Sequence, residues 1–489
     1  MKTKPNFLPG LSTKLYGRKR RSQLEALRAV RDKVLAASLS DYGALFGAIL
    51  PVESLEAAAR DGRRRLFPEV VVFWAWVSQI LEGNTSCAKA VTLVQRWYAA
   101  AALALPSFCT SAFCRARQRL SEEFLATVES RLAMFGEARL EEHHRWRGYR
   151  VKLVDGTSLQ LTDTALNQAE YPQPSAQKPG CGFPVMGVVA LLDVALGTVD
   201  DYLTGPSPGH DLEGLHRLVE RIQAKDLLVA DRAFCSWEML ALLNEKRAGC
   251  VMRLHQKREA KLDWRKGRKL DENSRLVEWA KPAKPGKSGI TKDAWERLPA
   301  TMEVRLVRLE APGRDRKPRT IYLATTLLDS EAYPTEEIAG LYGQRWSIEV
   351  RFRDLKTTMG LERLRVRTPE MARKTLRMAT ITYNLVKLLQ LEASQGEAPI
   401  LADEIGFKGT LDVLVEFRSG FIGLATRPRL LQHEREEVLA RIRERLLFIR
   451  PGRSEPRAIK TRPKAYPYLT TFRGEYVEIL HRSRYRKAA

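Results

Sequence analysis

The chain has 489 residues, too many for one ordinary hydrophobic core, so its length predicts two to four structural units. Its hydrophobic content of 44% is normal for a folded protein and argues against compositional disorder. The formal net charge of +24 opposes compaction and indicates a polyanionic partner. Because the basic residues are spread over the whole chain, they favour nucleic acid over a membrane surface, which would require one basic amphipathic helix.

Six cysteines are scattered along the chain, and none forms a C-x-x-C pair or a zinc-site spacing with histidine. We therefore expect reduced, mostly buried thiols in a cytoplasmic, nucleoid-associated protein. The N-terminal lysines are not followed by an apolar segment, so a signal peptide is not expected. The longest apolar stretch, Val70–Leu81, is too short to span a bilayer and contains Ser78 and Gln79, which predicts a buried helix.

Residues 1–145 predict a helical N-terminal DNA-binding domain, with helices at Ser22–Ser38 and Val91–Leu105. A short basic helix at Ser111–Leu120 follows the second of these and a Pro-Ser turn, which resembles a helix-turn-helix arrangement. Its polar side chains, which could read base edges in the major groove, are Arg115, Gln118 and Arg119. The alternative is an ordinary helical hairpin with a solvated arginine face.

From Tyr149 the hydrophobic period changes to that of strands, and residues 146–256 predict the first part of an RNase H-like α/β core. The order is three strands, helix, strand, helix, strand, at Tyr149–Leu161, Phe183–Val194, Thr198–Leu203, Asp211–Ile222, Leu227–Ala230, Ser236–Lys246 and Cys250–Leu254. Gly197 marks a hairpin turn between the second and third strands.

Residues 257–317 are rich in Lys, Arg, Pro and Gly and predict an inserted β-rich subdomain. The core resumes in residues 318–395 with a strand at Thr320–Thr326, a long helix from about Thr335 to Thr358, and a second helix from Thr368-Pro369 to about Ser394. Residues 396–489 predict a helical C-terminal region with a basic tail. The expected fold class is therefore α/β, an RNase H-like core with an inserted β-rich subdomain between helical terminal regions.

Two aspartates follow apolar strand residues. Asp155 lies in Leu-Val-Asp-Gly-Thr, and Asp231 lies in Leu-Val-Ala-Asp-Arg. Acids at such positions project from the carboxyl edge of a sheet, where α/β folds place their sites. A helix cap or turn former is the alternative for each aspartate taken singly.

Glu349 lies in a strongly helical segment together with Tyr342, Arg345, Arg353 and Lys356. At the period of an α-helix these residues share one stripe about 80° wide. One acid among three cations and a tyrosine suits a site that binds a metal and a phosphate backbone together. The alternative is a solvated helix face with pairs such as Arg345–Glu349.

The spacing Tyr-x2-Arg-x3-Glu-x6-Lys resembles the signature of the insertion-sequence-four family of DDE transposases. Asp155 and Asp231 match that family's two aspartates in order and strand context. The resemblance covers residues 150 to 395 well and residues 60 to 145 loosely. It implies an RNase H-like fold with a β-subdomain inserted between the second Asp and the Glu.

The resemblance also implies that Asp155, Asp231 and Glu349 hold two Mg²⁺ ions, with Mn²⁺ as a substitute, for cleavage of double-stranded DNA and strand transfer. The expected substrates are the terminal inverted repeats and target DNA. Because two ends must be brought together, we expect a homodimer on DNA. In relatives a hairpin intermediate forms and an aromatic residue of the insertion stacks on a flipped base. That position is Tyr322 here, where relatives carry Trp, which leaves the hairpin route open.

Two other functions stay open at this point. A catalytically inactive DNA-binding regulator of transposition would keep the basic helical regions but tolerate the loss of an acid. An RNase H-like nuclease would keep the acids and cut DNA without joining it. Among competing acids, Asp193 ends a strand, but its context predicts a hairpin turn.

Overall fold

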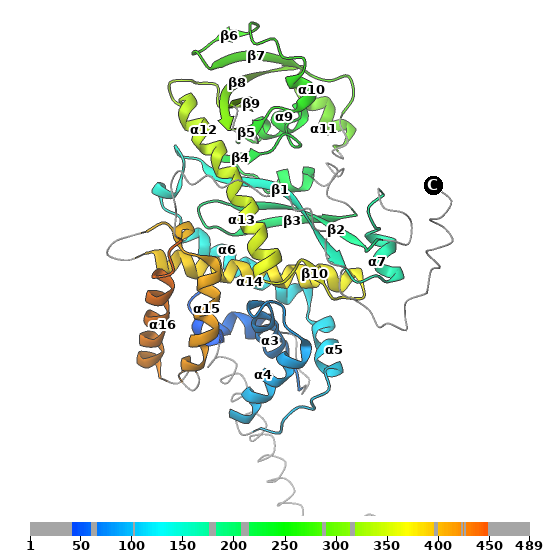
Figure 1. The fold of residues 1–489 in the computed structure, drawn as a ribbon, viewed down its shortest axis with the longest axis vertical. Coiled ribbons are helices and arrows are strands. Elements are labelled where there is room, and N and C mark those ends of the chain that lie inside the picture. Colours follow the sequence, from blue (N-terminus) through cyan, green and yellow to red (C-terminus); the bar gives the residue numbers. More distant parts are fainter. Residues whose placement is uncertain are drawn as a thin grey trace, which may run out of the picture. The chain divides into compact units, whose positions relative to one another are not determined.

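The computed structural model of the chain describes residues 42–59, 66–100, 103–175, 182–206, 215–285, 290–312, 318–395, 400–421, 424 and 427–447 (Figure 1). The chain forms two compact units. The first combines Met1–Leu140 with Met378–Leu446, and the second combines Glu141–Arg377 with Leu447–Ala489. The predicted helix at Ser22–Ser38 and the basic tail lie outside the described residues.

The first unit is helical in its described part. Its helices are α2 (Val52–Ala58), α3 (Glu69–Leu81), α4 (Cys87–Ala100), α5 (Ser111–Arg119), α6 (Glu122–Glu137), α15 (Phe407–Phe417) and α16 (Pro428–Arg443), together with the C-terminal part of α14 (Pro369–Ser394). Every residue of Val70–Leu81 is buried, as the apolar run predicts. The helix expected at Val91–Leu105 begins earlier, at Cys87, and ends at Ala100. Within the described residues, no helix combines the length and apolar character needed to cross a membrane.

The second unit is built on a ten-stranded mixed sheet. Its first part consists of β1 (Arg150–Leu161), β2 (Val185–Asp193), β3 (Val199–Gly205), α8 (Leu215–Glu220), β4 (Asp226–Ala230), α9 (Trp237–Glu245) and β5 (Gly249–Arg253), with the short α7 (Ala165–Glu170) after β1. The spatial order is β3-β2-β1-β4-β5, with β1, β2 and β3 antiparallel and with β4 and β5 parallel to β1. The predicted α/β fold class and strand sequence of an RNase H-like core are confirmed.

The insertion continues the same sheet. It contains α10 (Gln256–Glu259), β6 (Arg268–Lys269), β7 (Ser274–Ala280), α11 (Lys292–Arg297) and β8 (Thr301–Pro312). The strand β9 (Pro318–Thr325) pairs antiparallel with both β8 and β5, so the core sheet and the insertion share one hydrogen-bonded ladder. Trp237, Trp279 and Trp295 pack in the hydrophobic cluster that continues from the core into the insertion.

The helical run that follows β9 has the predicted extent but is not one uniform helix. It consists of α12 (Thr335–Gly343), a 3-10 turn (Gln344–Trp346), α13 (Ser347–Arg353) and a π-helical turn (Asp354–Thr358). The run is followed by β10 (Arg363–Leu364), which pairs with β1, and by α14, whose bounds match the prediction closely. Helix α12 contacts β4 and β5, and α13 contacts β1, so the run crosses the strands that carry the two aspartates.

Candidate active site

Asp155 and Asp231 lie next to each other on neighbouring parallel strands. The register of β1 and β4 pairs Val154 with Ala230, and each aspartate is the following residue of its strand path. Adjacent strands lie about 4.8 Å apart. Because side chains alternate along a strand, Asp155 points away from Val154, which packs in the cluster under α8 and α9. Both carboxylates therefore lie on the face of the sheet that the helical run contacts.

Arg345 connects Asp155 to Glu349. Its Nη1 lies 3.4 Å from Oδ2 of Asp155, and its Nη2 lies 3.8 Å from Oε1 of Glu349. The Arg345 side chain is only 7% exposed, whereas that of Glu349 is 54% exposed. One guanidinium thus links an acid of β1 to an acid of α13, although the two acids are far apart in the sequence.

The three acids interact electrostatically. Burial raises the pKa of Asp155, and the negative charges of Asp231 and Glu349 raise it further. The hydrogen bond from the Gly156 N–H and the positive charge of Arg345 lower this pKa, but the net shift is upward. The N–H of Gly156 donates to Oδ1 of Asp155 at 2.8 Å. Two neighbouring acids disfavour the charged form of the half-buried Asp155 carboxylate. An added cation would stabilise that charged form.

Carboxylate oxygens are the ligands that Mg²⁺ prefers, and Mg²⁺ keeps several waters, so three acids are enough to hold it. Within the described residues, no group of three His, Cys, Asp or Glu side chains lies close enough together to hold one ion. Arg345 is the cation that contacts Asp155 and Glu349 instead. The donor chemistry and the raised pKa of Asp155 fit a divalent metal, and the shared metal pair itself stays a prediction.

Tyr342 and Arg345 both lie at this site and are both buried. Burial raises the pKa of the Tyr342 hydroxyl, which also accepts a hydrogen bond from Arg345 and senses the charge of Asp231. Arg345 therefore contacts two of the acids in the structure, and Tyr342 contacts Arg345. Direct contact with phosphates requires Arg345 to exchange partners, and this role stays a prediction.

Trp346 is a residue that sequence reasoning missed. Its side chain is 60% exposed, and the Arg345 guanidinium lies 4.5 Å from the centre of its ring. The tryptophan that directly follows the signature arginine is the sequence feature that could have indicated it.

The other predicted cations of the helical run are more accessible. Arg353, the last residue of α13, is exposed, and Lys356 is half-buried in the π-helical turn. The 3-10 and π turns change the angle per residue, so the regular stripe expected from a uniform helix is not kept over its full length. Their contact with phosphate stays a prediction.

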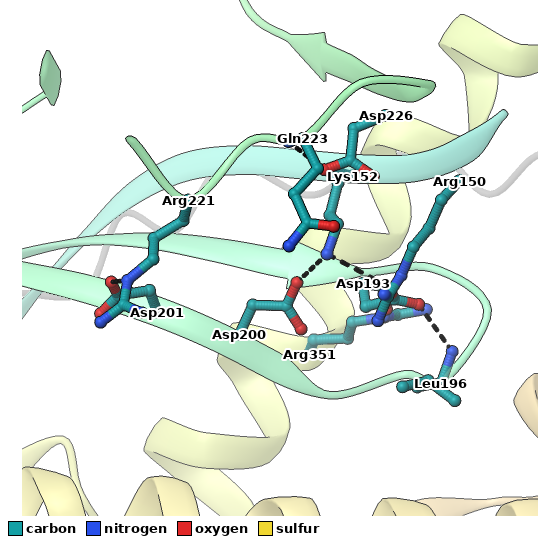
Figure 2. A network of polar contacts seen from close by, with 10 residues as sticks. All are labelled: Arg150, Lys152, Asp193, Leu196, Asp200, Asp201, Arg221, Gln223, Asp226 and Arg351. Atoms are coloured by element: carbon teal, nitrogen blue, oxygen red, sulfur yellow. Dashed lines mark hydrogen bonds and ion pairs between the residues drawn. The ribbon is translucent and has the colours of Figure 1, made fainter. Parts of the chain in front are cut away.

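Arg351 is a second residue that was missed. It is buried on α13, and its Nη1 donates to the main-chain carbonyl of Asp193 at 2.8 Å (Figure 2). The buried Asp193 carboxylate pairs with Arg150 and Lys152, and Lys152 also pairs with Asp200. Oδ1 of Asp193 accepts from Leu196 N at 2.8 Å, which confirms the predicted hairpin turn.

Tyr322 lies within β9, where it is half-buried and packs against the hydrophobic cluster. Its ring centre is 5.5 Å from that of Trp264. Two arginine side chains, Arg275 and Arg308, lie over the Trp264 ring, at 5.5 Å and 5.2 Å from its centre. Base stacking by Tyr322 stays a prediction.

In the first unit, α5 spans Ser111–Arg119, close to the predicted bounds. The three candidate base-reading side chains, Arg115, Gln118 and Arg119, are exposed. Phe113, Ala116 and Leu120 are buried. This arrangement is compatible with base reading and equally with a solvated helix face.

Residues 146–385 match a family model described as a transposase DDE domain. The chain is 25% identical, over 407 residues, to the transposase InsG for insertion sequence element IS4 of Escherichia coli, covering 83% of this chain and 88% of that one. A piggyBac transposase synaptic complex with hairpin DNA aligns at a TM-score of 0.41 and 11% identity, covering 84% of this chain and 86% of that chain.

Proposed function

The chain belongs to the DDE transposases of the insertion-sequence-four type, and from this premise we propose that Asp155, Asp231 and Glu349 are its catalytic carboxylates. The observation that carries the proposal is the parallel register of β1 and β4, which puts Asp155 and Asp231 side by side. Arg345 supports the inclusion of Glu349, because its one guanidinium contacts both Asp155 and Glu349.

The proposed activity is cleavage of double-stranded DNA at the element's terminal inverted repeats, followed by strand transfer into target DNA. In the first step a water oxygen bonds to the scissile phosphorus, and the bond to the 3′ oxygen breaks, which leaves a 3′-OH and a 5′-phosphate. In the second step that 3′-OH attacks a target phosphorus and displaces another 3′ oxygen. A hairpin intermediate is a variant in which the opposite strand is attacked first.

The three acids would hold two Mg²⁺ ions, or Mn²⁺ in their place. When bound, such a pair supplies an activated water and a stabilised leaving oxygen. Arg345 supports this proposal because it compensates the charge of two of these acids, Asp155 and Glu349, in the structure. Arg353 and Lys356 would contact phosphates beside the scissile bond, where varied target sequences must be accepted.

The test uses the full-length protein, Mg²⁺ and linear DNA that carries the element's terminal repeats with their flanks. Products are read on a denaturing gel. We expect cut and joined products for the wild type and none above background for Asp155→Asn, Asp231→Asn and Glu349→Gln, with DNA binding retained. Asp163→Asn is the matched control, because Asp163 follows β1 and its Oδ1 accepts a local bond from Gln168 at 2.8 Å.

The outcomes separate the alternatives. Binding without any cleavage by the wild type would indicate an inactive regulator of transposition. Cut products without joined ones would indicate a nuclease. Full activity of Glu349→Gln would remove Glu349 from the site. The molar mass of the protein on a single repeat end and on paired ends tests the proposed homodimer.

A further inference from the structure

Among the described residues of the first unit, one buried arginine has no carboxylate partner. Arg117, on α5, is 8% exposed, and its guanidinium lies 3.9 Å from the centre of the Trp76 ring. Within the described residues its hydrogen-bond acceptor is the sulfur of Cys87, 3.2 Å from Nη1, and no Asp or Glu pairs with it. Arginine stays protonated in proteins, and a buried charge without a counter-charge is strongly destabilising. Among the described residues, Cys87 is therefore the group placed to supply a counter-charge for Arg117.

The surroundings of Cys87 favour its ionised form. Cys87 is the first residue of α4, where the helix dipole stabilises negative charge. Nε2 of Gln79 lies 3.9 Å from its sulfur. The Cys114 thiol on α5 donates a hydrogen bond to Cys87, and this bond, with the Arg117 charge, lowers the pKa of Cys87 to about 5. The same contact raises the pKa of Cys114, which therefore remains a protonated thiol.

We propose that Cys87 is a thiolate held by Arg117, and that it is a site of reaction with peroxides in which Cys114 supplies the second thiol. Both side chains are half-buried and so partly accessible. The thiolate attacks one oxygen of the peroxide, the O–O bond breaks, and Cys87 becomes a sulfenic acid while hydroxide leaves. The Cys114 sulfur then attacks the Cys87 sulfur, the S–O bond breaks, and a disulfide and water form. Two thiols lose two electrons to one peroxide.

The remaining described cysteines differ in ways that make them internal standards. Cys235 and Cys250 are buried, and burial raises the pKa of Cys235 to about 12 and of Cys250 to about 11. Cys109 is exposed, and its sulfur contacts the hydroxyl of Ser111 at 3.2 Å. We therefore expect Cys235 and Cys250 to be inert in the folded protein. Hydrogen bonds with Ser111 lower the pKa of Cys109, so Cys109 tests whether an exposed thiol that is not paired with Arg117 reacts as fast as Cys87.

The first test is iodoacetamide labelling of the folded full-length protein across pH, with each cysteine peptide quantified by mass spectrometry. We expect the rate of Cys87 labelling to rise with a midpoint near pH 5, as its pKa of about 5 requires. In Arg117→Met the midpoint should rise, because the Arg117 charge and hydrogen bond are lost while the Cys114 hydrogen bond still lowers it in part, whereas Arg117→Lys should keep it low. A wild-type midpoint above about pH 8 would overturn the proposal, and this measurement does not depend on the folding of either variant.

The second test is treatment with hydrogen peroxide followed by a non-reducing peptide map. We expect a Cys87–Cys114 disulfide in the wild type and in Cys109→Ser. In Cys114→Ser we expect a Cys87 sulfenic acid that dimedone traps. A map in which Cys109 is oxidised first while Cys87 stays reduced contradicts the proposal, because exposure would then outweigh the pairing with Arg117.

Discussion

The guanidinium of Arg351, on the same helix as Glu349, donates a 2.8 Å hydrogen bond to the main-chain carbonyl of Asp193 at the end of β2. The side chain of Asp193 is fully buried and pairs with Arg150 and Lys152 of β1. The helix that carries Glu349 is thus tied to the two strands that carry and flank Asp155 (Figure 2). We interpret Arg351 as a residue that positions Glu349 without contacting DNA.

Arg351→Met should reduce DNA cleavage, because the loss of the bond to Asp193 lets α13 shift relative to β1. It should also lower stability by about 1–3 kcal/mol, since a buried carbonyl loses its partner. A purely structural role would lower the melting temperature without changing the response to metal. A positioning role predicts that a higher Mg²⁺ concentration is needed for half-maximal cleavage, while affinity for repeat DNA stays unchanged.

Arg221→Met is the matched control, because Arg221 makes an exposed ion pair with Asp201 in the same network. Exposed pairs contribute about 0–1 kcal/mol, so stability and cleavage should be nearly unchanged. If Arg351→Met has the wild-type metal response after correction for the folded fraction, Arg351 has no positioning role.

The raised pKa of Asp155 predicts a pH-dependent effect on stability. An acid whose pKa is higher in the folded protein binds more protons there, so stability falls as pH rises from the unfolded value of about 3.9 through the folded value. Asp155→Asn removes this cost, and in EDTA it should melt at a higher temperature than the wild type at pH 7, but not at pH 3. A variant that melts below the wild type at pH 7 would mean that the pairing of Asp155 with Arg345 outweighs burial and the like charges.

Metal binding should stabilise the wild type. A ligand at a hundred times its dissociation constant adds about 2.7 kcal/mol to the free energy of unfolding. In a unit of this size, each kcal/mol raises Tm by about 2–4 °C. We expect Mg²⁺ to raise Tm of the wild type and of Asp163→Asn, but not of Asp231→Asn. An equal rise in all three proteins would indicate that Mg²⁺ binds elsewhere.

Arg353 is exposed at the end of α13, so its contact with phosphate should depend on charge alone. Arg353→Ala should weaken binding to repeat and scrambled DNA equally and lower the slope of log K against log salt by about 1. Fluorescence anisotropy at several salt concentrations measures both quantities, with Arg221→Ala as the control. A loss confined to repeat DNA would mean that Arg353 reads sequence.

The strands and the adjacency of Asp155 and Asp231 could be predicted because apolar runs mark buried strands, and because acids that follow such runs meet at one sheet edge. The start of α14 followed from a proline at the first helical position. These features depend on residues close together in sequence.

Arg351 and Arg345 could not be placed in the same way. In sequence both are charged residues of an amphipathic helix, and their burial depends on Asp193 and Asp155, which are far away in the chain. The expectation of mostly buried thiols was wrong for Cys109, Cys87 and Cys114, while Cys181 lies outside the described residues. Composition predicts the redox state of cysteines, but it does not predict how far neighbouring helices bury each one.

We expect α5 to recognise the terminal repeats. Reading a base sequence requires a helix or ribbon in the major groove, and arginine pairs with guanine edges as glutamine pairs with adenine. Arg115, Gln118 and Arg119 are exposed, while Phe113, Ala116 and Leu120 hold α5 in the first unit, so changing the three polar residues to alanine should leave the fold intact. Each lost contact should reduce the preference for repeats over random DNA by about 1–3 kcal/mol in a competition binding assay. Arg131→Ala, an exposed arginine on α6, is the control and should keep the preference. If the triple variant keeps it as well, while its circular dichroism and Tm match the wild type, α5 is a solvated helix face, and repeats are recognised by another part of the chain, for which the basic insertion is the next region to test.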